Sequence, residues 1–120
     1  MRHPLIACFR TAWQGLRWLV THEVNAGIHA VATLVVIGLG FGLRVSRTDW
    51  CWLVVAIALV WIAEALNTAI EQLADEISLE NRERLGRAKD VGAGAVLVAA
   101  IAAVAIGTIV FFPRVRELLG

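Results

Sequence analysis

The sequence predicts an all-α membrane protein in which an N-terminal amphipathic surface helix precedes three transmembrane helices, all in a single domain over residues 1–120. Hydrophobic residues make up 59% of the chain and charged residues only 18%, against about 45–50% and about 25% in soluble domains. The mean hydropathy is high, at +0.74. Three apolar stretches are close to or above the roughly 20 residues that a bilayer crossing requires. The composition therefore excludes an ordinary soluble domain.

The first element, residues 1–24, is expected to lie in the membrane interface rather than to cross the bilayer. Its apolar side chains share one helical face and its polar side chains share the opposite face. No apolar core precedes a small-x-small site, so a cleaved signal peptide is not expected. The apolar face holds Leu5, Phe9, Ala12, Trp13, Leu16 and Val20, and the polar face holds Arg10, Gln14, Arg17 and Thr21.

The three expected crossings differ in quality. Residues 26–43 carry only His29 as an ionisable group, and their length is barely sufficient for a bilayer crossing. Residues 50–75 begin with an uncharged half and continue into a carboxylate-rich half, so this helix is expected to emerge at the membrane surface. Residues 91–112 carry no charge and are closed by Pro113 and a basic end.

Basic residues favour a cytoplasmic N-terminus. Three crossings place the N-terminal segment and the 76–90 connection on one side of the membrane, and that side carries seven of the 11 lysines and arginines. Because basic segments are retained in the cytoplasm, we expect a multi-pass protein of the inner (plasma) membrane with its N-terminus inside the cell. The seven are Arg2, Arg10, Arg17, Arg82, Arg84, Arg87 and Lys89, and the other four are Arg44, Arg47, Arg114 and Arg116.

A stripe of polar side chains near the cytoplasmic end of the second span is the strongest functional signal. Its members, at i, i+3, i+7 and i+11, are Glu64, Asn67, Glu71 and Asp75. At about 100° per residue, the three carboxylates point within roughly 20° of a common direction. Ionisable side chains near a bilayer are costly unless they face a protein interior or a wet cavity and bind something. The stripe therefore predicts a functional site, and carboxylates favour a cation as its ligand.

The connection over residues 79–90 mixes acidic and basic side chains. Two acid–base pairs in it have i,i+4 spacing, which is typical of a solvated helical extension. Lys89 and Asp90 open the third span, and for them a role in the site is the better interpretation. The two pairs are Glu80/Arg84 and Glu83/Arg87.

The arginines, cysteines and tryptophans of the chain do not indicate a further functional site. The arginines are dispersed, and no basic patch interleaves with aromatic side chains, so nucleic acid is not an expected partner. Cys8 and Cys51 belong to no CxxC pair and are interpreted as structural thiols. Interface anchoring is the interpretation of the five tryptophans, which are Trp13, Trp18, Trp50, Trp52 and Trp61.

The motifs in and around the stripe resemble the signature of a known family. The stripe has the form E-x-x-N-x-x-x-E, as Glu64-Ala-Leu-Asn67-Thr-Ala-Ile-Glu71, followed by Asp75, then by Ala88-Lys89-Asp90 and Gly94-Ala-Val. Upstream stand Ala12-Trp-Gln-Gly15-Leu, Glu23-Val-Asn25 and Ile28-His29. Over about residues 9–113 this composite is similar to the small prokaryotic membrane kinases that phosphorylate diacylglycerol or undecaprenol. The chain has no Walker-type GxxxxGK[ST] loop, and that family lacks one.

The resemblance implies ATP-dependent phosphorylation of a membrane lipid alcohol, with Mg²⁺ bound to the nucleotide. Glu64 matches the family's general base, and Glu23 and Glu71 match the carboxylates that hold the divalent metals. Asn67 and Asp75, together with Glu64, would bind and order the lipid substrate. ATP would contact Glu23, Glu71, Glu80, Asn81, Arg82, Lys89 and Asp90. These roles fit phosphoryl transfer, which needs charge neutralisation and positioning more than covalent chemistry.

The resemblance also implies an assembly and a substrate branch. The family forms homotrimers, and the alanine- and glycine-rich third span permits close helix packing. Asn25, Ile28 and His29 resemble the undecaprenol branch more than the diacylglycerol branch, although Gly27 stands where that branch commonly has an arginine. A lone histidine on an apolar face is otherwise a satisfied interior residue. Undecaprenol is therefore the favoured substrate and diacylglycerol the second.

Two other classes of function remain open. Membrane glutamates also serve in carboxylate-based ion or proton carriers. A carrier, however, does not need Lys89 and Asp90 or a nucleotide-sized cluster at the interface. A structural subunit of a larger complex gives no reason for three carboxylates on one stripe. Consumption of ATP on addition of a lipid alcohol separates the kinase from both.

Overall fold

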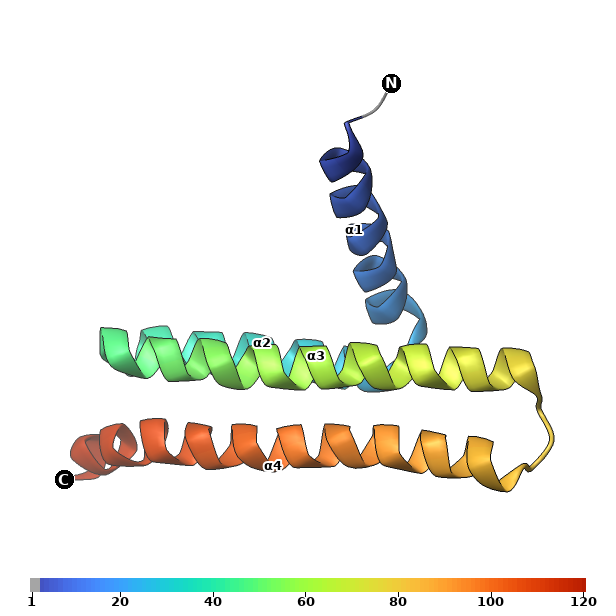
Figure 1. The fold of residues 1–120 in the computed structure, drawn as a ribbon. Coiled ribbons are helices and arrows are strands. Elements are labelled where there is room, and N and C mark those ends of the chain that lie inside the picture. Colours follow the sequence, from blue (N-terminus) through green and yellow to red (C-terminus); the bar gives the residue numbers. More distant parts are fainter. Residues whose placement is uncertain (1–2) are drawn as a thin grey trace.

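Residues 3–120 form four α-helices in the structure, which is a computed structural model and describes only these residues. Helices α2, α3 and α4 lie side by side, and α1 projects from them at a steep angle (Figure 1). The described part of the chain contains no strand. Arg2, which entered the charge comparison, lies outside it. In chain order the helices are α1 (Pro4–His22), α2 (Val24–Gly42), α3 (Arg47–Ile77) and α4 (Glu83–Leu119).

Helices α2, α3 and α4 are long and apolar enough to cross a membrane, and they coincide with the three predicted spans. They contain 19, 31 and 37 residues, and at 1.5 Å per residue they are roughly 28, 46 and 55 Å long. The hydrocarbon core of a bilayer is about 30 Å thick. Helix α2 therefore just spans it, whereas α3 and α4 are long enough to continue into the aqueous phase.

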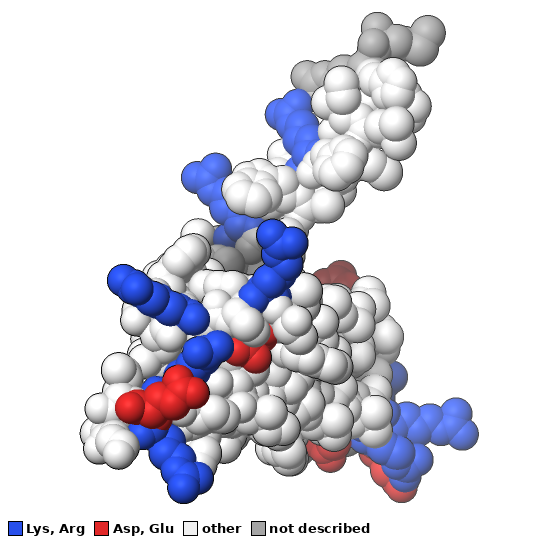
Figure 2. Space-filling view, turned by 90° about the vertical axis from the view of Figure 1, so that its left-hand side faces the viewer, with Lys and Arg blue, Asp and Glu red and all other residues white. Residues whose placement is uncertain are grey.

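Helix α1 begins at a proline and packs little against the rest of the chain. Pro4 stands in the first turn, where its missing N–H is not needed, and His3 Nδ1 accepts a hydrogen bond from the Leu5 N–H at 3.4 Å. Leu19 is the buried residue of this helix, whereas Phe9 is 77% exposed and Trp13 68% exposed. Figure 2 shows basic side chains projecting from one side of α1. Apart from Leu19, the apolar side chains of α1 thus have little cover among residues 3–120.

The turn between α2 and α3 is set by local chemistry. Arg44 has a positive φ of 52°, which reverses the chain just after α2. Ser46 and Asp49 then form a capping box at the start of α3, with each side chain accepting from the other residue's N–H. The Trp50 ring lies against Gly40 so closely that an added Cβ would meet it. The turn therefore fixes how α2 and α3 enter the bundle.

A small apolar core closes this end of the bundle. Val45, Leu53 and Val110 are buried together, with partly buried side chains such as Trp50 and Ile106 around them. Polar contacts lie beyond this core. Arg114 Nη2 lies 3.9 Å from Asp49 Oδ2, and Arg114 Nη1 lies 3.7 Å from Glu117 Oε2. The core and these charges hold α4 against the beginning of α3.

The helix boundaries differ from the expected ones mostly in α4. Helix α4 begins at Glu83, so the charged segment before residue 91 is already helical, and the Glu83–Arg87 pair is formed at 2.9 Å. Glu80 lies before α4 in the non-helical connection, so its expected helical pairing with Arg84 is wrong. Helix α4 also continues through Pro113 to Leu119, and the expected end at Pro113 is wrong. A proline removes its own N–H bond and bends a helix, but it does not always end one.

Candidate active site

The polar stripe of α3 passes from the interior of the bundle to its surface. Glu64 is only 2% exposed and Asn67 6% exposed. Glu71, two turns further on, is half-buried, and Asp75 is exposed. The stripe therefore carries one carboxylate in the protein interior and two toward the solvent. The C-terminal part of α3, which carries the outer end of the stripe, extends past the start of α2 (Figure 1).

The register between α2 and α3 gives the depth of each carboxylate. Glu64 faces His29, which lies five residues into α2, or roughly 8 Å from its start. Because α2 just spans the apolar layer, Glu64 lies inside that layer. Glu71 lies seven residues further along α3, or roughly 10 Å from Glu64. Because α3 runs antiparallel to α2, this step leads back to the level at which α2 begins, and slightly past it. Glu23 immediately precedes α2, so Glu23 and Glu71 lie at similar depth at the interface end.

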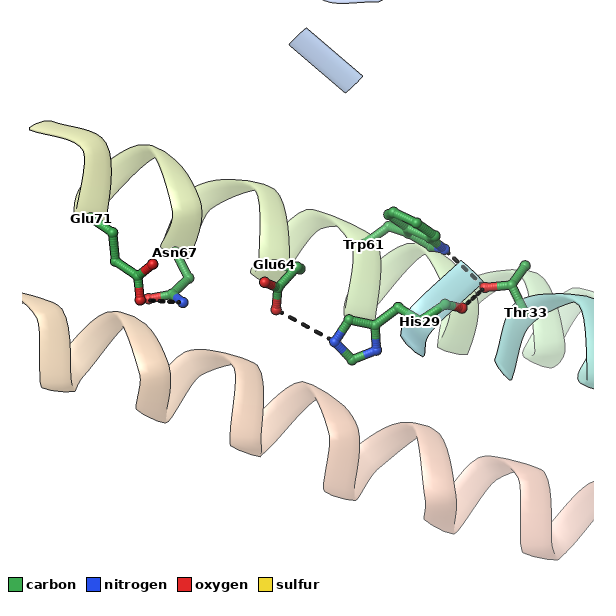
Figure 3. A network of polar contacts seen from close by, with 6 residues as sticks. All are labelled: His29, Thr33, Trp61, Glu64, Asn67 and Glu71. Carbon is green, nitrogen blue, oxygen red and sulfur yellow. Dashed lines mark hydrogen bonds and ion pairs between the residues drawn. The ribbon is translucent and has the colours of Figure 1, made fainter. Parts of the chain in front are cut away.

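Glu64 faces a histidine on the neighbouring helix. The His29 Nε2 and Glu64 Oε2 atoms are 3.4 Å apart, and the His29 side chain is 18% exposed (Figure 3). Glu64 Oε2 is a buried oxygen with no hydrogen-bond partner among the described residues. Burial of an unpaired carboxylate is strongly unfavourable. The site therefore holds a carboxylate whose accepting capacity is not satisfied by the chain itself.

Asn67 connects the buried and exposed halves of the stripe. Its Nδ2 donates to Glu71 Oε1 at 3.3 Å (Figure 3), and its Oδ1 is buried without a partner in the described part of the chain. Gly92 of α4 lies directly opposite, and a Cβ at that position would stand 2.5 Å from Asn67 Oδ1. The absence of a side chain at Gly92 thus lets α4 approach α3 at the level of the amide.

Thr68 presents a third unsatisfied group, on the side of α1. It is 4% exposed, and its Oγ1 has no partner among residues 3–120. Thr68 also lines a hollow of about 460 Å³ between α1 and α3, whose other walls include Ala12, Leu16, Ala65 and Gln72. A mostly apolar hollow with a few polar groups has the character of a site for an amphipathic molecule.

The connection between α3 and α4 surrounds a second hollow, of about 400 Å³. Four of the residues expected to contact nucleotide line it: Glu80, Asn81, Arg82 and Lys89. The other three of the seven expected residues, Glu23, Glu71 and Asp90, are not part of the lining, and Asp90 is exposed. Lys89 Nζ donates to Asp75 Oδ1, so an ion pair joins α4 to the outer end of the stripe.

A divalent cation would have few protein ligands in a single chain. Residues 3–120 contain no group of three or more His, Cys, Asp or Glu side chains placed to hold a metal ion. Glu23 is half-buried between α1 and α2, and its side chain makes no capping hydrogen bond. Two carboxylates at similar depth nevertheless fit Mg²⁺, which is usually held by one or two carboxylates together with phosphates and water.

Sequence reasoning missed two members of the polar network, Thr33 and Trp61. The Trp61 indole Nε1–H donates to Thr33 Oγ1 at 2.9 Å, and the Thr33 hydroxyl donates to the His29 carbonyl oxygen at 2.7 Å (Figure 3). Trp61 was expected to anchor the chain at the interface, but it bridges α3 and α2. The available signal was the spacing, since Trp61 precedes Glu64 by three residues and Thr33 follows His29 by four, which puts each pair on one helical face.

Comparison with known proteins gives a consistent result. Residues 10–111 match the family described as prokaryotic diacylglycerol kinase. The diacylglycerol kinase of Escherichia coli strain K12 is 40% identical over 93 residues, which cover 78% of this chain and 76% of the relative. The undecaprenol kinase of Bacillus subtilis strain 168 is 34% identical over 106 residues, covering 88% of this chain and 86% of the relative. The diacylglycerol kinase of Haemophilus influenzae is 31% identical over 109 residues, covering 90% and 92%. These relatives do not support the ion or proton carrier.

Proposed function

The chain belongs to the prokaryotic diacylglycerol kinase family and is a lipid kinase of the membrane, and from this premise we propose that it transfers the γ-phosphoryl group of ATP to undecaprenol, or second to diacylglycerol. The products are undecaprenyl phosphate or phosphatidic acid, and ADP. The reaction takes place at the cytoplasmic face of the inner (plasma) membrane, where a water-soluble nucleotide and a lipid hydroxyl can meet.

The separation of the carboxylates by depth is the observation that carries this proposal. Glu64 is buried, whereas Glu71 is half-buried roughly 10 Å further along α3. A lipid alcohol presents its hydroxyl from the membrane side, and ATP arrives from the water side. One stripe thus supplies a carboxylate to each substrate at the depth where that substrate arrives.

Glu64 acts as the general base. Its carboxylate takes the proton of the lipid hydroxyl as that oxygen attacks the γ-phosphorus, and the bond to the β,γ-bridging oxygen breaks to release ADP. Glu64 then returns the proton to water. Asn67 orders the acceptor and the hydrogen bonds around it. Asp75 was expected to contact the lipid as well, but it is exposed on the water side of Glu71 and paired with Lys89, so it orders the outer hydrogen bonds of the site. Such positioning is the main contribution of protein groups to phosphoryl transfer.

Glu23 and Glu71 would hold Mg²⁺ with the nucleotide phosphates. The bound ion supplies charge neutralisation on the transferred group. The hollow at the α3–α4 connection takes the outer part of ATP, with the Lys89 ammonium as a counter-charge to phosphate. Contacts from Glu80, Asn81, Arg82 and Asp90 complete this nucleotide site.

Helix α1 lies in the membrane interface, and three chains assemble as a homotrimer. The steep angle between α1 and the three spans (Figure 1) supports an orientation of α1 along the membrane plane. Within one chain the spans leave large apolar side chains uncovered, such as Leu34 at 70% exposed and Val104 at 69% exposed. A neighbouring subunit would cover part of this surface and add groups to a site that one chain leaves incomplete.

The test is phosphoryl transfer by purified full-length protein in vesicles, with ATP labelled on the γ-phosphate. Undecaprenol and diacylglycerol are offered separately at the same mole fraction in the lipid. We expect label in the lipid product for both alcohols, with faster transfer to undecaprenol. Faster transfer to diacylglycerol would reverse the order of substrates, and transfer to neither alcohol would contradict the proposed function.

A further inference from the structure

We propose that His29 is a positioning residue for Glu64, which it orients by donating its Nε2–H to the Oε2 atom of the carboxylate. This inference rests on the proposed function, because it assumes that Glu64 is the base. The pair is interhelical, from α2 to α3, and it is nearly enclosed, with Glu64 2% exposed and the His29 side chain 18% exposed. Nothing in the lipid kinase reaction as described above requires this histidine.

The two side chains lie close together across the interface between α2 and α3. The Nε2 and Oε2 atoms are 3.4 Å apart, and the imidazole reaches from α2 to the carboxylate in Figure 3. Oε2 makes no hydrogen bond among the described residues. A shift of about 0.5 Å, together with a turn of the imidazole N–H toward Oε2, would give the pair the geometry of an ordinary charge-assisted hydrogen bond, about 2.7–2.9 Å long. His29 thus places a donor group beside a buried oxygen that lacks one.

A second contact between α2 and α3 lies one turn from His29. Thr33 Oγ1 donates to the His29 carbonyl oxygen at 2.7 Å and accepts from Trp61 Nε1–H at 2.9 Å. The Trp61 ring also meets the imidazole edge-on, with ring centres 6.4 Å apart and planes at 65°. Trp61 and Glu64 lie on one face of α3, and Thr33 and His29 lie on the facing side of α2. The two contacts together fix the rotation of α2 against α3 at the level of the base.

Orientation matters because a carboxylate has two oxygens and a free torsion. With Oε2 held by His29, Oε1 is the oxygen left to accept the proton of the lipid hydroxyl. Figure 3 shows this second oxygen directed away from the imidazole. Without the donor, Glu64 would rotate among positions and would carry an unpaired oxygen in the protein interior, which is costly.

Two variants separate this role from the alternatives. In His29→Gln, the side-chain amide Nε2–H₂ can replace the donor, but it cannot carry a proton as imidazole does. In His29→Ala the donor is lost. We expect kcat to fall at least about 10-fold in the alanine variant, since small displacements of a reacting group cost one to two orders of magnitude. The glutamine variant should stay within about 3-fold of the unaltered protein, and the apparent KM for Mg-ATP should not change in either.

His3→Gln is the matched control, because His3 is exposed at the start of α1 and distant in sequence from both spans. It should retain full activity. If His29→Ala keeps the kcat of the unaltered protein, the inference is wrong. If His29→Gln loses as much activity as His29→Ala, the imidazole carries a proton rather than orienting the base, and the positioning role is also wrong.

A double-mutant cycle with Glu64→Gln separates positioning from a general loss of structure. If His29 acts through Glu64, His29→Ala should cost less than about 2-fold in kcat once the carboxylate is gone, because interacting residues are not additive. Equal losses in both backgrounds would assign His29 to structure alone and overturn the inference. The proposed function fails separately: if Glu64→Gln retains near-normal kcat, the base assignment is wrong, whatever the His29 variants do.

Discussion

Replacing Gly92 by alanine should disturb the proposed metal site without unfolding the protein. The new Cβ would stand 2.5 Å from Asn67 Oδ1, and ordinary contacts begin at 3.4 Å, so the amide oxygen has to move by about 0.9 Å. The amide is the end of a side chain and can rotate, but rotation breaks the 3.3 Å bond from Asn67 Nδ2 to Glu71 Oε1. The perturbation therefore reaches Glu71 through Asn67.

The effect on stability should be small because two contributions oppose each other. Alanine is better than glycine in a helix interior by about 0.8–1.0 kcal/mol. Loss of one hydrogen bond costs about 0.5–1.5 kcal/mol. The net change is within about 1 kcal/mol of zero. Loss of an outer partner of a metal-binding carboxylate, in contrast, typically costs about 10–100-fold in metal affinity or activity. We expect the Mg²⁺ concentration for half-maximal activity to rise at least about 10-fold.

The assay is phosphoryl transfer in vesicles as a function of Mg²⁺ at saturating ATP, with thermal unfolding as the measure of stability. Gly107→Ala is the control, since it makes the same change in α4 and an added Cβ there meets nothing within 4 Å. Its Mg²⁺ dependence should match that of the unaltered protein. An unchanged Mg²⁺ requirement in Gly92→Ala, or an equal rise in the control, would refute the link from Gly92 through Asn67 to Glu71.

Three further predictions follow from the same geometry. Glu71→Ala and Glu23→Ala should each raise the Mg-ATP concentration needed for activity, because each removes one of two anionic ligands; unchanged apparent affinity in both variants would show that these roles are wrong. Glu64→Gln should lower kcat by about 10²-fold or more while the KM for ATP stays constant, whereas loss of nucleotide binding would move Glu64 into the metal site. Lys89→Met removes an ion pair to Asp75 in which both side chains are more than a third exposed, so the free energy of unfolding should change by less than about 1 kcal/mol. The KM for ATP should rise, and a constant KM would show that Lys89 does not belong to the nucleotide site.

Part of the connection between α3 and α4 could not be placed correctly from the sequence. Hydropathy identifies where α4 is apolar, from about residue 91, but not where its backbone becomes helical. The helix begins earlier because Glu83 and Arg87 form an i,i+4 pair and the charged turns have water on their exposed side. At the other end, Pro113 was expected to stop the helix. It does not, because the backbone groups it leaves unpaired lie near the end of the span, where water can reach them.

By itself, the sequence determined the three spans, the one-sided stripe from Glu64 to Asp75 and the family, because each depends on periodicity or spacing within one segment. Only the tertiary structure decided what the stripe faces. Trp61 meets Thr33 across 28 positions of sequence, and Glu64 meets His29 on another helix. Periodicity fixes which side chains share a face, but it does not fix how far one helix is rotated or shifted against the next. That register comes from close packing, as where Gly92 lets α4 approach α3.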